Sequence, residues 1–286
     1  MIQKIRISDD LKKDLHEEVI KGRLPGGSYS IRSAWPGIQL YYPPIKYLPA
    51  EERYETEPEA RARLGKYARS SEAHTIIFDL EDGCRQKSMS RGFLEATLPE
   101  VRSAIPGRVA LRINQMYSAE NLLDMRLIEK IYPYIDDIML AKAGELKGGN
   151  EIDDLSAFLG SLRPELRIQP IIEHPRSLKL ADEIFSFVTV KHAVFGIHDF
   201  SRALHLQITP ENWLEELYPF ACQLMLEARL AGKGLIGGVE TLLLDNAPPE
   251  IPLIPEWLSG HASPNAKIIF DHARREANMG FTGKQV

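Results

Sequence analysis

TIIFDLEDG, residues 75–83, is the stretch of sequence that decides the fold. Its first part, 75–80, is apolar except for Thr75 and Asp79, as expected of a strand buried on both faces of a parallel sheet. The stretch then adds two further acids, Glu81 and Asp82, and closes on a glycine. A buried strand that runs into a polar turn is typical of a βα unit, so the same pattern is expected to recur along the chain.

Apolar runs of similar length do recur, and longer amphipathic stretches separate them. The predicted strands are 38–42, 75–80, 108–114, 137–142, 167–173, 192–197 and 234–239, with an eighth beginning at 283–286. The predicted helices are 54–70, 86–104, 119–132, 150–162, 176–187, 210–232 and 264–279. Regular alternation of strand and helix over 286 residues predicts an α/β fold of the (β/α)8 TIM-barrel type, with parallel strands and outer helices.

The predicted domain organisation is one barrel with a short extension. Residues 1–27 are polar with a short helical pattern, and they end in the break Leu-Pro-Gly-Gly. Residues 28–286 then form a single barrel domain. The proline-rich stretch 241–263 follows the seventh strand, and long loops after a barrel strand often serve as lids. A surface excursion packed by Trp257 and Leu258 explains that stretch equally well.

Composition restricts the class of protein. The formal net charge is −5, with 35 basic and 40 acidic residues spread along the chain, which argues against a nucleic-acid partner. The first residues lack the apolar core of a signal peptide, and no run of about 18 apolar residues predicts a membrane span. Two cysteines, Cys84 and Cys222, are too few for a disulfide framework. A cytoplasmic protein is therefore expected.

Polar side chains fall where the predicted strands end. Besides the acids of the 75–83 stretch, Arg112 ends the next strand, Glu173 ends the fifth, and Asp199 follows the sixth. In a β/α barrel the catalytic groups project from the carboxyl ends of the strands, at one rim. These side chains are therefore predicted to form one site.

Glu173 and Asp199 are the predicted ligands of a magnesium ion. Each follows an apolar run that would bury it at a strand end, where an unpaired charge is unfavourable. Magnesium prefers carboxylate oxygens and completes its coordination with water and substrate, so two carboxylates suffice. The alternative is that each acid pairs with an arginine.

Arg112 has two interpretations. A guanidinium group at the end of a buried strand requires an anionic partner and offers two parallel hydrogen bonds. It either pairs with Asp79 or Glu81 as a structural ion pair, or binds a substrate carboxylate. We favour substrate binding, because ligands sit at this rim.

Three other residues at the rim carry weaker signals. His174 and His198 each lie beside a proposed metal ligand, and each could be a general base or only a hydrogen-bond donor. Gly238 lies in a glycine pair that permits close approach of a ligand. A tight turn between strand and helix would explain the pair as well.

Five segments together resemble a known family. They are IIFDLEDGCRQKSMSR (76–91), ALRIN (110–114), PIIEHPRSL (170–178), FGIHDFS (195–201) and GFTGK (280–284). In this order and at this spacing they are similar to the citrate lyase beta-subunit and malyl-CoA lyase group of barrel aldolases. The resemblance covers roughly residues 75 to 286.

The resemblance implies roles for individual residues. It assigns magnesium to Glu173 and Asp199 and the substrate carboxylate to Arg112, and it places the acids Asp79, Glu81 and Asp82 beside that arginine and the metal-bound waters. Family members open with a segment that helps bind acyl-CoA. The corresponding region here, 31–49, keeps only Arg32, Ser33 and some prolines, which makes Arg32 a candidate substrate-binding residue.

The implied activity is magnesium-dependent cleavage or formation of a carbon–carbon bond in a 3-hydroxyacyl thioester, such as a citryl-, malyl- or citramalyl-CoA, through an enolate. One alternative is an aldolase acting on a free 2-oxo or hydroxy acid without coenzyme A. The other is a non-catalytic barrel that serves as a binding or assembly subunit. The family's C-terminal lid has no counterpart before Val286, so loop 241–263 is the candidate for closing the site.

The resemblance also implies assembly into a homo-oligomer. Aromatic side chains that we expect to be exposed, among them Trp35, Tyr41 and Tyr42, could form the interface.

Overall fold

The computed structural model describes residues 37–70, 73–105, 107–146, 150–209, 212–238, 272 and 275–285. The expectations for the extension 1–27, for Arg32 and Trp35, and for loop 241–263 fall outside these residues, as does most of the predicted helix 264–279. The described residues from Gly37 onward belong to one compact unit.

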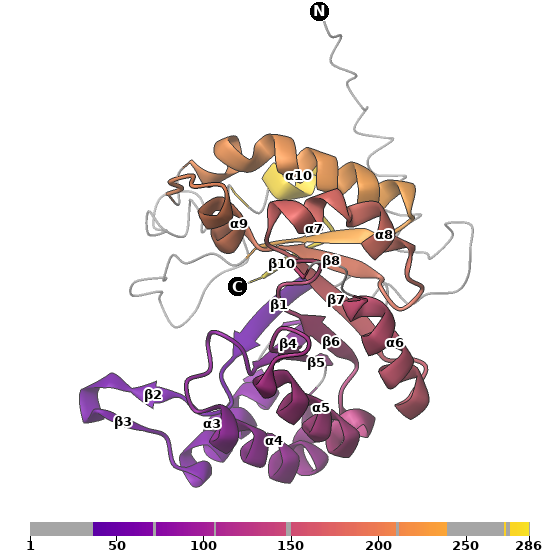
Figure 1. Ribbon diagram of the computed structural model, residues 1–286. Helices are drawn as coiled ribbons and strands as arrows, with labels where there is room; N and C mark the ends of the chain where they lie inside the picture. Colours follow the sequence, from indigo (N-terminus) through magenta and orange to yellow (C-terminus); the bar gives the residue numbers. More distant parts are fainter. Residues whose placement is uncertain are drawn as a thin grey trace, which may run out of the picture. The chain divides into compact units, whose positions relative to one another are not determined.

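Eight parallel strands close into a barrel in the order β1-β10-β9-β8-β7-β6-β5-β4 (Figure 1). They are β1 Gly37–Tyr42, β4 Thr75–Asp79, β5 Arg108–Ile113, β6 Asp137–Leu140, β7 Arg167–Ile172, β8 His192–Phe195, β9 Gly234–Gly237 and β10 Gly283–Gln285. Each predicted strand is present, and the last three described residues of the chain complete the ring between β1 and β9. The predicted (β/α)8 fold is confirmed.

Helices follow the strands on the outside of the barrel (Figure 1). They are α3 Glu57–Ser70, α4 Lys87–Val101, α5 Ala119–Ile131, α6 Glu151–Leu162, α7 Pro175–Lys179, α8 Ala181–Ser186, α9 Ile197–Ala203 and α10 Trp213–Leu230, with short 3-10 helices η1 Pro49–Glu51, η2 Arg102–Ala104 and η3 Tyr132–Tyr134. The predicted helix 176–187 is in fact two short helices that meet at Leu180.

A small hairpin precedes α3 and was not predicted. β2, Tyr47–Leu48, pairs antiparallel with β3, Arg53–Tyr54, so α3 begins three residues later than expected, at Glu57. Each strand is only two residues long, too short for the period-2 pattern by which a strand is recognised in sequence.

The end of β8 differs from the prediction in a way that matters for the site. The strand stops at Phe195 instead of 197, and Asp199 lies in the first turn of α9. Gly196 marks the change, since its N–H donates to Ile172 O and its carbonyl accepts from Phe200 N, the first bond of the new helix. The apolar character of β8 continues into the first residue of α9, Ile197, so the sequence pattern did not indicate where the strand ends.

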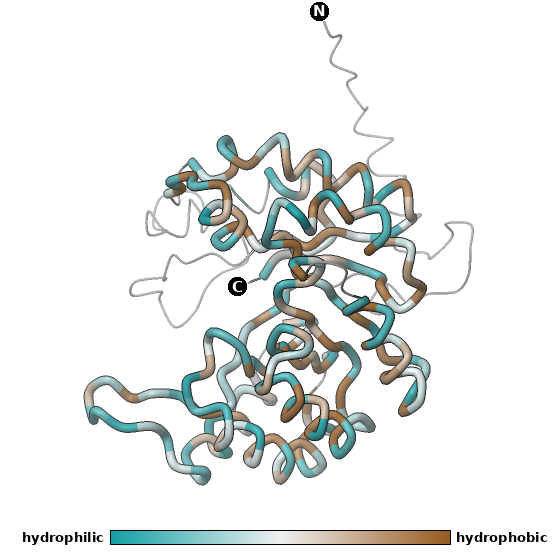
Figure 2. Tube along the Cα trace, in the orientation of Figure 1, coloured by the Kyte–Doolittle hydropathy of each residue, from teal (hydrophilic) through white to brown (hydrophobic). Residues whose placement is uncertain are grey.

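The strands carry the core on both faces. Every residue of β4, β6 and β9 is buried, and Figure 2 shows the apolar residues concentrated along the strands and on the inner sides of the helices. Burying one large apolar side chain contributes about 1.5–3 kcal/mol. The barrel interior also holds a polar layer, in which Gln39 donates to Gln169 at 3.0 Å and Gln285 donates to Gln39 at 3.1 Å.

The expectation that Tyr41 and Tyr42 are exposed is wrong. Tyr42 is 4% exposed and packs against Phe78 outside the sheet, while Tyr41 contacts Met139 and Gln285 in the barrel interior. Alternate residues of a strand point to opposite faces, and here both faces are covered.

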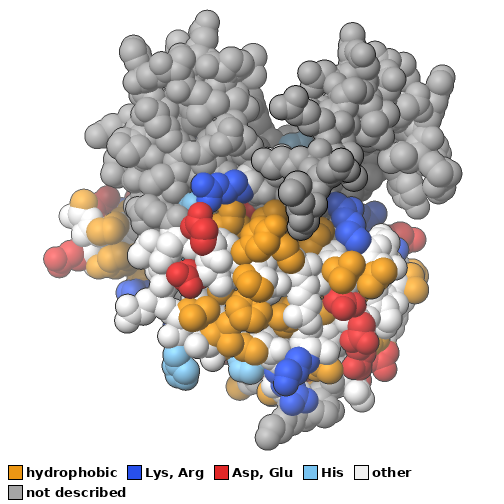
Figure 3. All heavy atoms as spheres, turned by 90° about the horizontal axis from the view of Figure 1, so that it is seen from above, with side chains coloured by type: hydrophobic (Ala, Val, Ile, Leu, Met, Phe, Trp, Pro, Cys, Tyr) orange, Lys and Arg blue, Asp and Glu red, His pale blue; other side chains and the backbone are white. Residues whose placement is uncertain are grey.

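Exposed apolar side chains lie instead on α10, where Tyr218, Leu226 and Leu230 are 50%, 58% and 75% exposed. Figure 3 shows apolar side chains gathered on this side of the molecule. Among the helices described, none combines the length and the apolar character needed to cross a membrane.

Candidate active site

A cavity of about 430 Å³ opens at the carboxyl ends of the barrel strands. Its polar lining includes Asp79 from β4, Arg112 from β5, Glu173 after β7 and Asp199 from α9. The other lining residues are Leu40, Tyr41, Gly83, Ile171, Val194, Gly196, Ile197, His198 and Gln285. Four side chains that the sequence placed at one rim thus line one cavity.

Arg112 and Asp79 form a bidentate ion pair inside this cavity. Nε donates to Oδ1 and Nη2 to Oδ2, each at 2.7 Å, and Nη1 lies 3.3 Å from Glu81 Oε2. The guanidinium group also lies over the ring of Tyr41, 5.0 Å from its centre. The ion pair considered for Arg112 is therefore present, and the arginine still lines the cavity wall.

Asp79 uses both carboxylate oxygens within the protein. Besides the two bonds from Arg112, Oδ1 accepts from Glu81 N at 2.9 Å and Oδ2 from Gly83 N at 3.1 Å. A Cβ at Gly83 would lie 2.2 Å from Asp79 Oδ2, so a glycine is required there. Asp79 thus holds Arg112 and the following acidic turn in place.

Glu173 is buried and only half of its carboxylate is engaged. Oε1 accepts from the backbone N–H of Lys142 at 2.6 Å. Oε2 lies beside Gly196 on the cavity wall and has no hydrogen bond to any described residue. Burial raises the pKa of Glu173 to about 8 despite the Lys142 hydrogen bond, and the charges on Asp199 and Glu81 add to the rise.

Asp199 is more accessible than Glu173. Its side chain is 29% exposed and pairs with Arg202, one turn further along α9, whose side chain is 79% exposed. The alternative in which an arginine satisfies each acid therefore describes Asp199 only, because the described residues offer Glu173 no arginine partner. A surface pair of this kind contributes about 0–1 kcal/mol, so a cation can replace Arg202 at low cost.

Two of the predicted acids lie beside the cavity. Glu81 is buried; its Oε1 pairs with Lys142 Nζ at 2.7 Å and its Oε2 accepts from Asp82 N at 2.8 Å. The side chain of Asp82 is exposed. Lys142 was not predicted as a site residue: it ends the predicted strand 137–142, and a single lysine at a strand end reads as an ordinary surface residue. The observed strand β6 stops two residues earlier, at Leu140.

A polar network of Lys87, Asn114 and Asp124 supports the acidic turn that follows β4. The sequence analysis did not predict this network. Lys87 Nζ donates to the carbonyls of Leu80 and Glu81 and to Asn114 Oδ1, at 2.6–2.9 Å. Asn114 in turn donates to Asp124 Oδ2 at 2.7 Å. Asn114 ends the predicted third strand, and its polar character was the available signal.

The remaining predicted residues take other positions. His174 caps α7, with Nδ1 accepting from Arg176 N at 3.0 Å, whereas His198 lines the cavity. Gly238 does not belong to the cavity lining; a Cβ there would lie 2.6 Å from the carbonyl oxygen of Phe195, so close packing of β9 against β8 explains the glycine.

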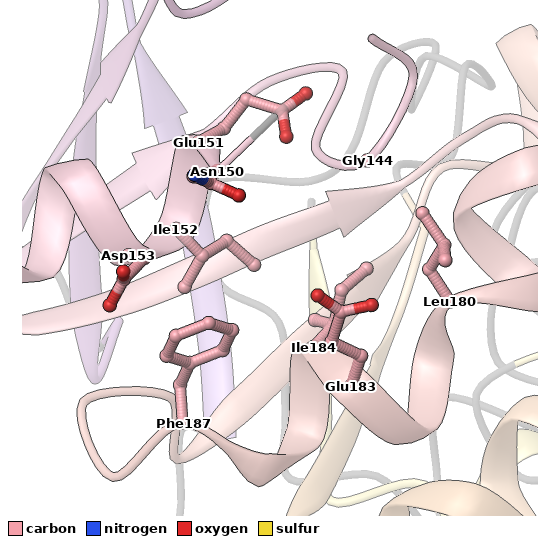
Figure 4. A pocket seen from close by; sticks show the side chains of 9 residues that line it. All are labelled: Gly144, Asn150, Glu151, Ile152, Asp153, Leu180, Glu183, Ile184 and Phe187. Carbon is pink, nitrogen blue, oxygen red and sulfur yellow. The ribbon is translucent and has the colours of Figure 1, made fainter. Parts of the chain in front are cut away.

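A second cavity, of about 230 Å³, lies between α6 and α8 (Figure 4). Three acids line it, Glu151, Asp153 and Glu183, but Figure 4 shows that their carboxylates do not point to a common centre. It contains neither an arginine nor a lysine. The cavity at the strand ends is therefore the better candidate for the active site.

Within the described residues, three or more His, Cys, Asp or Glu side chains do not come together as a metal-binding group. The pair Glu173 and Asp199 matches what magnesium needs, since this ion is commonly held by one or two carboxylates and keeps several waters. Two observations on the pair fit a cation, namely the unsatisfied Oε2 of Glu173 and the raised pKa of this acid, which burial causes and the charge of Asp199 increases.

Sequence comparison finds no family model and no curated protein that matches the chain. Comparison with solved structures finds many similar folds. The citrate lyase beta subunit from Mycobacterium tuberculosis, complexed with oxaloacetate and magnesium, is 20% identical over 89% of this chain and 92% of that chain, with a TM-score of 0.59. A citrate lyase from Burkholderia xenovorans is 17% identical over 87% of this chain and 72% of that chain, with a TM-score of 0.66.

A third similar structure is the protein CitE from Mycobacterium tuberculosis in complex with magnesium, acetoacetate and coenzyme A. It is 19% identical over 89% of this chain and 76% of that chain, with a TM-score of 0.59. At this level of identity the likeness establishes the fold. The chain therefore has the barrel fold of citrate lyase beta-subunit structures, in a divergent sequence, and the structural resemblance expected from the five segments is confirmed.

Proposed function

We propose that this protein is a magnesium-dependent carbon–carbon bond lyase. One observation carries the proposal: Glu173 Oε2 has no hydrogen-bond partner among the described residues, in a cavity that Asp199 and Arg112 also line. The cavity thus offers two acids that can hold a metal cation and a fixed guanidinium group that can bind a substrate carboxylate. Similar structures bind magnesium with oxaloacetate or pyruvate, which supports the assignment.

The charge of the cavity lining supports a divalent cation. Three carboxylates, Asp79, Glu173 and Asp199, and one guanidinium group, Arg112, leave a formal charge of −2 when all are ionised. A divalent cation balances this charge. Without the cation, burial favours the protonated form of Glu173. Glu173 and Asp199 would hold the ion, as the resemblance implies.

The residues of this chain then have separate tasks. Magnesium supplies a Lewis acid that stabilises negative charge on substrate oxygens. Arg112 binds the substrate carboxylate with the N–H groups that Asp79 leaves available, and Asp79 keeps the guanidinium plane fixed. Leu40, Ile171 and Val194 form an apolar wall that excludes water from the reacting carbons. Glu81 and Asp82 complete the acidic turn beside this site.

The proposed substrate is a 3-hydroxyacyl thioester of the citryl-, malyl- or citramalyl-CoA type, cleaved or formed through an enolate. A similar structure that binds coenzyme A with acetoacetate supports the thioester. Arg32 is the proposed contact on the N-terminal side, and a homo-oligomer in the cytoplasm is the proposed state. An aldolase acting on a free 2-oxo acid would use the same four cavity residues, and the 430 Å³ cavity suits a small acid of that kind.

Calorimetric titration tests the proposal. Metal-free protein is titrated with magnesium, then with oxaloacetate or glyoxylate, and then with acetyl-CoA. Magnesium-dependent binding of the oxo acid that tightens with acetyl-CoA is the expected result. Oxo-acid binding indifferent to the thioester would favour the free-acid aldolase. Absence of magnesium binding would overturn the lyase and favour a non-catalytic barrel.

A further inference from the structure

Lys142 has an unusual backbone for a lysine. It follows β6 by two residues and has a φ of +56°, in the left-handed region that favours glycine. A lysine adopts this conformation only when surrounding contacts hold it there, and such residues cluster at functional sites. The left-handed conformation of Lys142 therefore needs a reason other than turning the chain after β6, and the contacts of this residue provide one.

The left-handed turn directs the backbone N–H of Lys142 toward the neighbouring strand. There it donates to Glu173 Oε1 at 2.6 Å. This bond fixes the carboxylate of Glu173 so that its other oxygen, Oε2, lies against Gly196 on the cavity wall. One oxygen of the proposed metal ligand is thus occupied by the protein and one is presented to the cavity.

The side chain of Lys142 reaches the other way, across β5. Its Nζ pairs with Glu81 Oε1 at 2.7 Å, while the second oxygen of Glu81 is shared by Asp82 N and the Nη1 of Arg112. Glu81 is buried and its charge acts on Glu173, so a third carboxylate lies within electrostatic reach of the proposed cation site.

We propose that Lys142 is a positioning residue that sets the ligands of the cation: its backbone presents Glu173 Oε2, and its ammonium group keeps Glu81 out of the coordination sphere. This inference rests on the proposed magnesium site. The ion is then held by two carboxylates and retains free positions for substrate oxygens. Without the ammonium group, Oε1 of Glu81 would be released to bind the cation.

Lys142 should therefore affect which divalent cation the site prefers. Calcium takes six to eight oxygen ligands in flexible geometry, whereas magnesium demands six and keeps several waters. A third carboxylate therefore benefits calcium more than magnesium. In Lys142→Met we expect calcium affinity to rise at least tenfold and magnesium affinity to rise less, because a positive charge is lost and a carboxylate is gained.

The experiment is calorimetric titration of the full chain with magnesium or calcium alone, with thermal unfolding to confirm the fold of each variant. Lys142→Arg keeps the charge and should leave the calcium-to-magnesium preference as in the wild type. Lys130→Met is the matched control, because Lys130 also pairs with a glutamate, Glu95, but on the surface. It should change neither affinity.

A second measurement does not depend on the stability of Lys142→Met. Glu81→Gln alone should leave the calcium-to-magnesium preference as in the wild type, since Glu81 is not a ligand while Lys142 is present and its charge acts on both cations alike. The double variant Lys142→Met/Glu81→Gln should lose the gain in calcium affinity. A changed calcium-to-magnesium preference in Glu81→Gln, or unchanged calcium affinity in Lys142→Met, overturns the inference.

The outcomes separate this inference from the proposed function. Magnesium binding by the wild type with no change in Lys142→Met leaves the lyase proposal standing and removes the role of Lys142. Cation binding by Lys142→Met but not by the wild type supports the restraint on Glu81 and contradicts a magnesium-dependent enzyme. Absence of binding by both overturns the two together.

Discussion

The carboxylate of Asp79 holds the guanidinium group of Arg112 through two parallel hydrogen bonds of 2.7 Å, between the ends of the adjacent strands β4 and β5. The same arrangement occurs at the opposite end of β5, where Arg108 pairs with Asp137 at 2.7 and 2.9 Å. One strand therefore carries two bidentate pairs, of which only the first lines the cavity. The second is a natural control for the first.

Asp79→Asn should destabilise the fold by about 3 kcal/mol, because it leaves the charge of Arg112 buried without its anionic partner. Asp137→Asn should have a destabilising effect of the same order. Only Asp79→Asn should also weaken oxo-acid binding, since only that pair fixes a cavity residue. Urea denaturation and calorimetry measure the two effects. Equal binding by the two variants would assign Asp79 to structure alone.

Arg112→Lys should lose most of the turnover, by about a hundredfold or more, because a lysine cannot form the two parallel bonds that fix the guanidinium plane. Single-turnover measurement at saturating substrate separates this loss from weaker binding. Arg108→Lys, at the other end of the strand, is the control and should retain turnover. Unchanged kinetics in Arg112→Lys would make the arginine a structural residue.

Glu173→Gln should abolish measurable magnesium binding while the fold is kept, because the amide replaces the buried anionic ligand with a neutral group of the same shape. Asp199→Asn should weaken binding as well. Titration with magnesium, checked by circular dichroism, measures both. Retained magnesium affinity in the two variants would exclude these residues as the metal pair.

The pKa of Glu173 predicts a dependence of stability on pH. Burial raises it from an ordinary value of 4.5 to about 8, so between these values the folded chain holds a proton that the unfolded chain has lost. The stabilising contribution is fully present below pH 4.5 and is lost as the pH rises through 8. Metal-free protein should therefore be less stable at pH 9 than at pH 6.

Glu173→Gln provides the comparison, because it cannot ionise and should lack this part of the pH dependence in urea denaturation. Magnesium affinity of the wild type should follow the opposite trend and fall by about tenfold per pH unit below pH 8, since the ion requires the ionised acid. Equal pH profiles for wild type and Glu173→Gln would contradict the raised pKa.

Gly83→Ala should destabilise the acidic turn and weaken oxo-acid binding, because the added Cβ would lie 2.2 Å from Asp79 Oδ2 and force this carboxylate away from Arg112. Gly92→Ala is the matched control. Gly92 lies in α4 with no atom within 4 Å of the added Cβ, so alanine should stabilise the helix by about 0.5–1 kcal/mol. Thermal unfolding and calorimetry compare the two.

Much of the fold could be read from the sequence, because strands covered on both faces must be apolar throughout and cannot be mistaken for loops. β4 and β6 were predicted for this reason, as were the acids that end β4. The hairpin at Tyr47–Tyr54 was missed since its strands are too short for a periodic signal. The start of α9 was missed since the apolar run of β8 continues into the helix.

The sequence by itself determined which residues reach the rim, because a residue's place at a strand end follows from local hydrophobic pattern. Only the tertiary structure decided how those residues pair. Arg112 meets Asp79, and Lys142 links Glu81 with Glu173, because the closed barrel brings β4, β5, β6 and β7 side by side in one register. Partner choice among charged groups depends on distances of a few ångströms between segments remote in sequence, and local pattern contains no record of such distances.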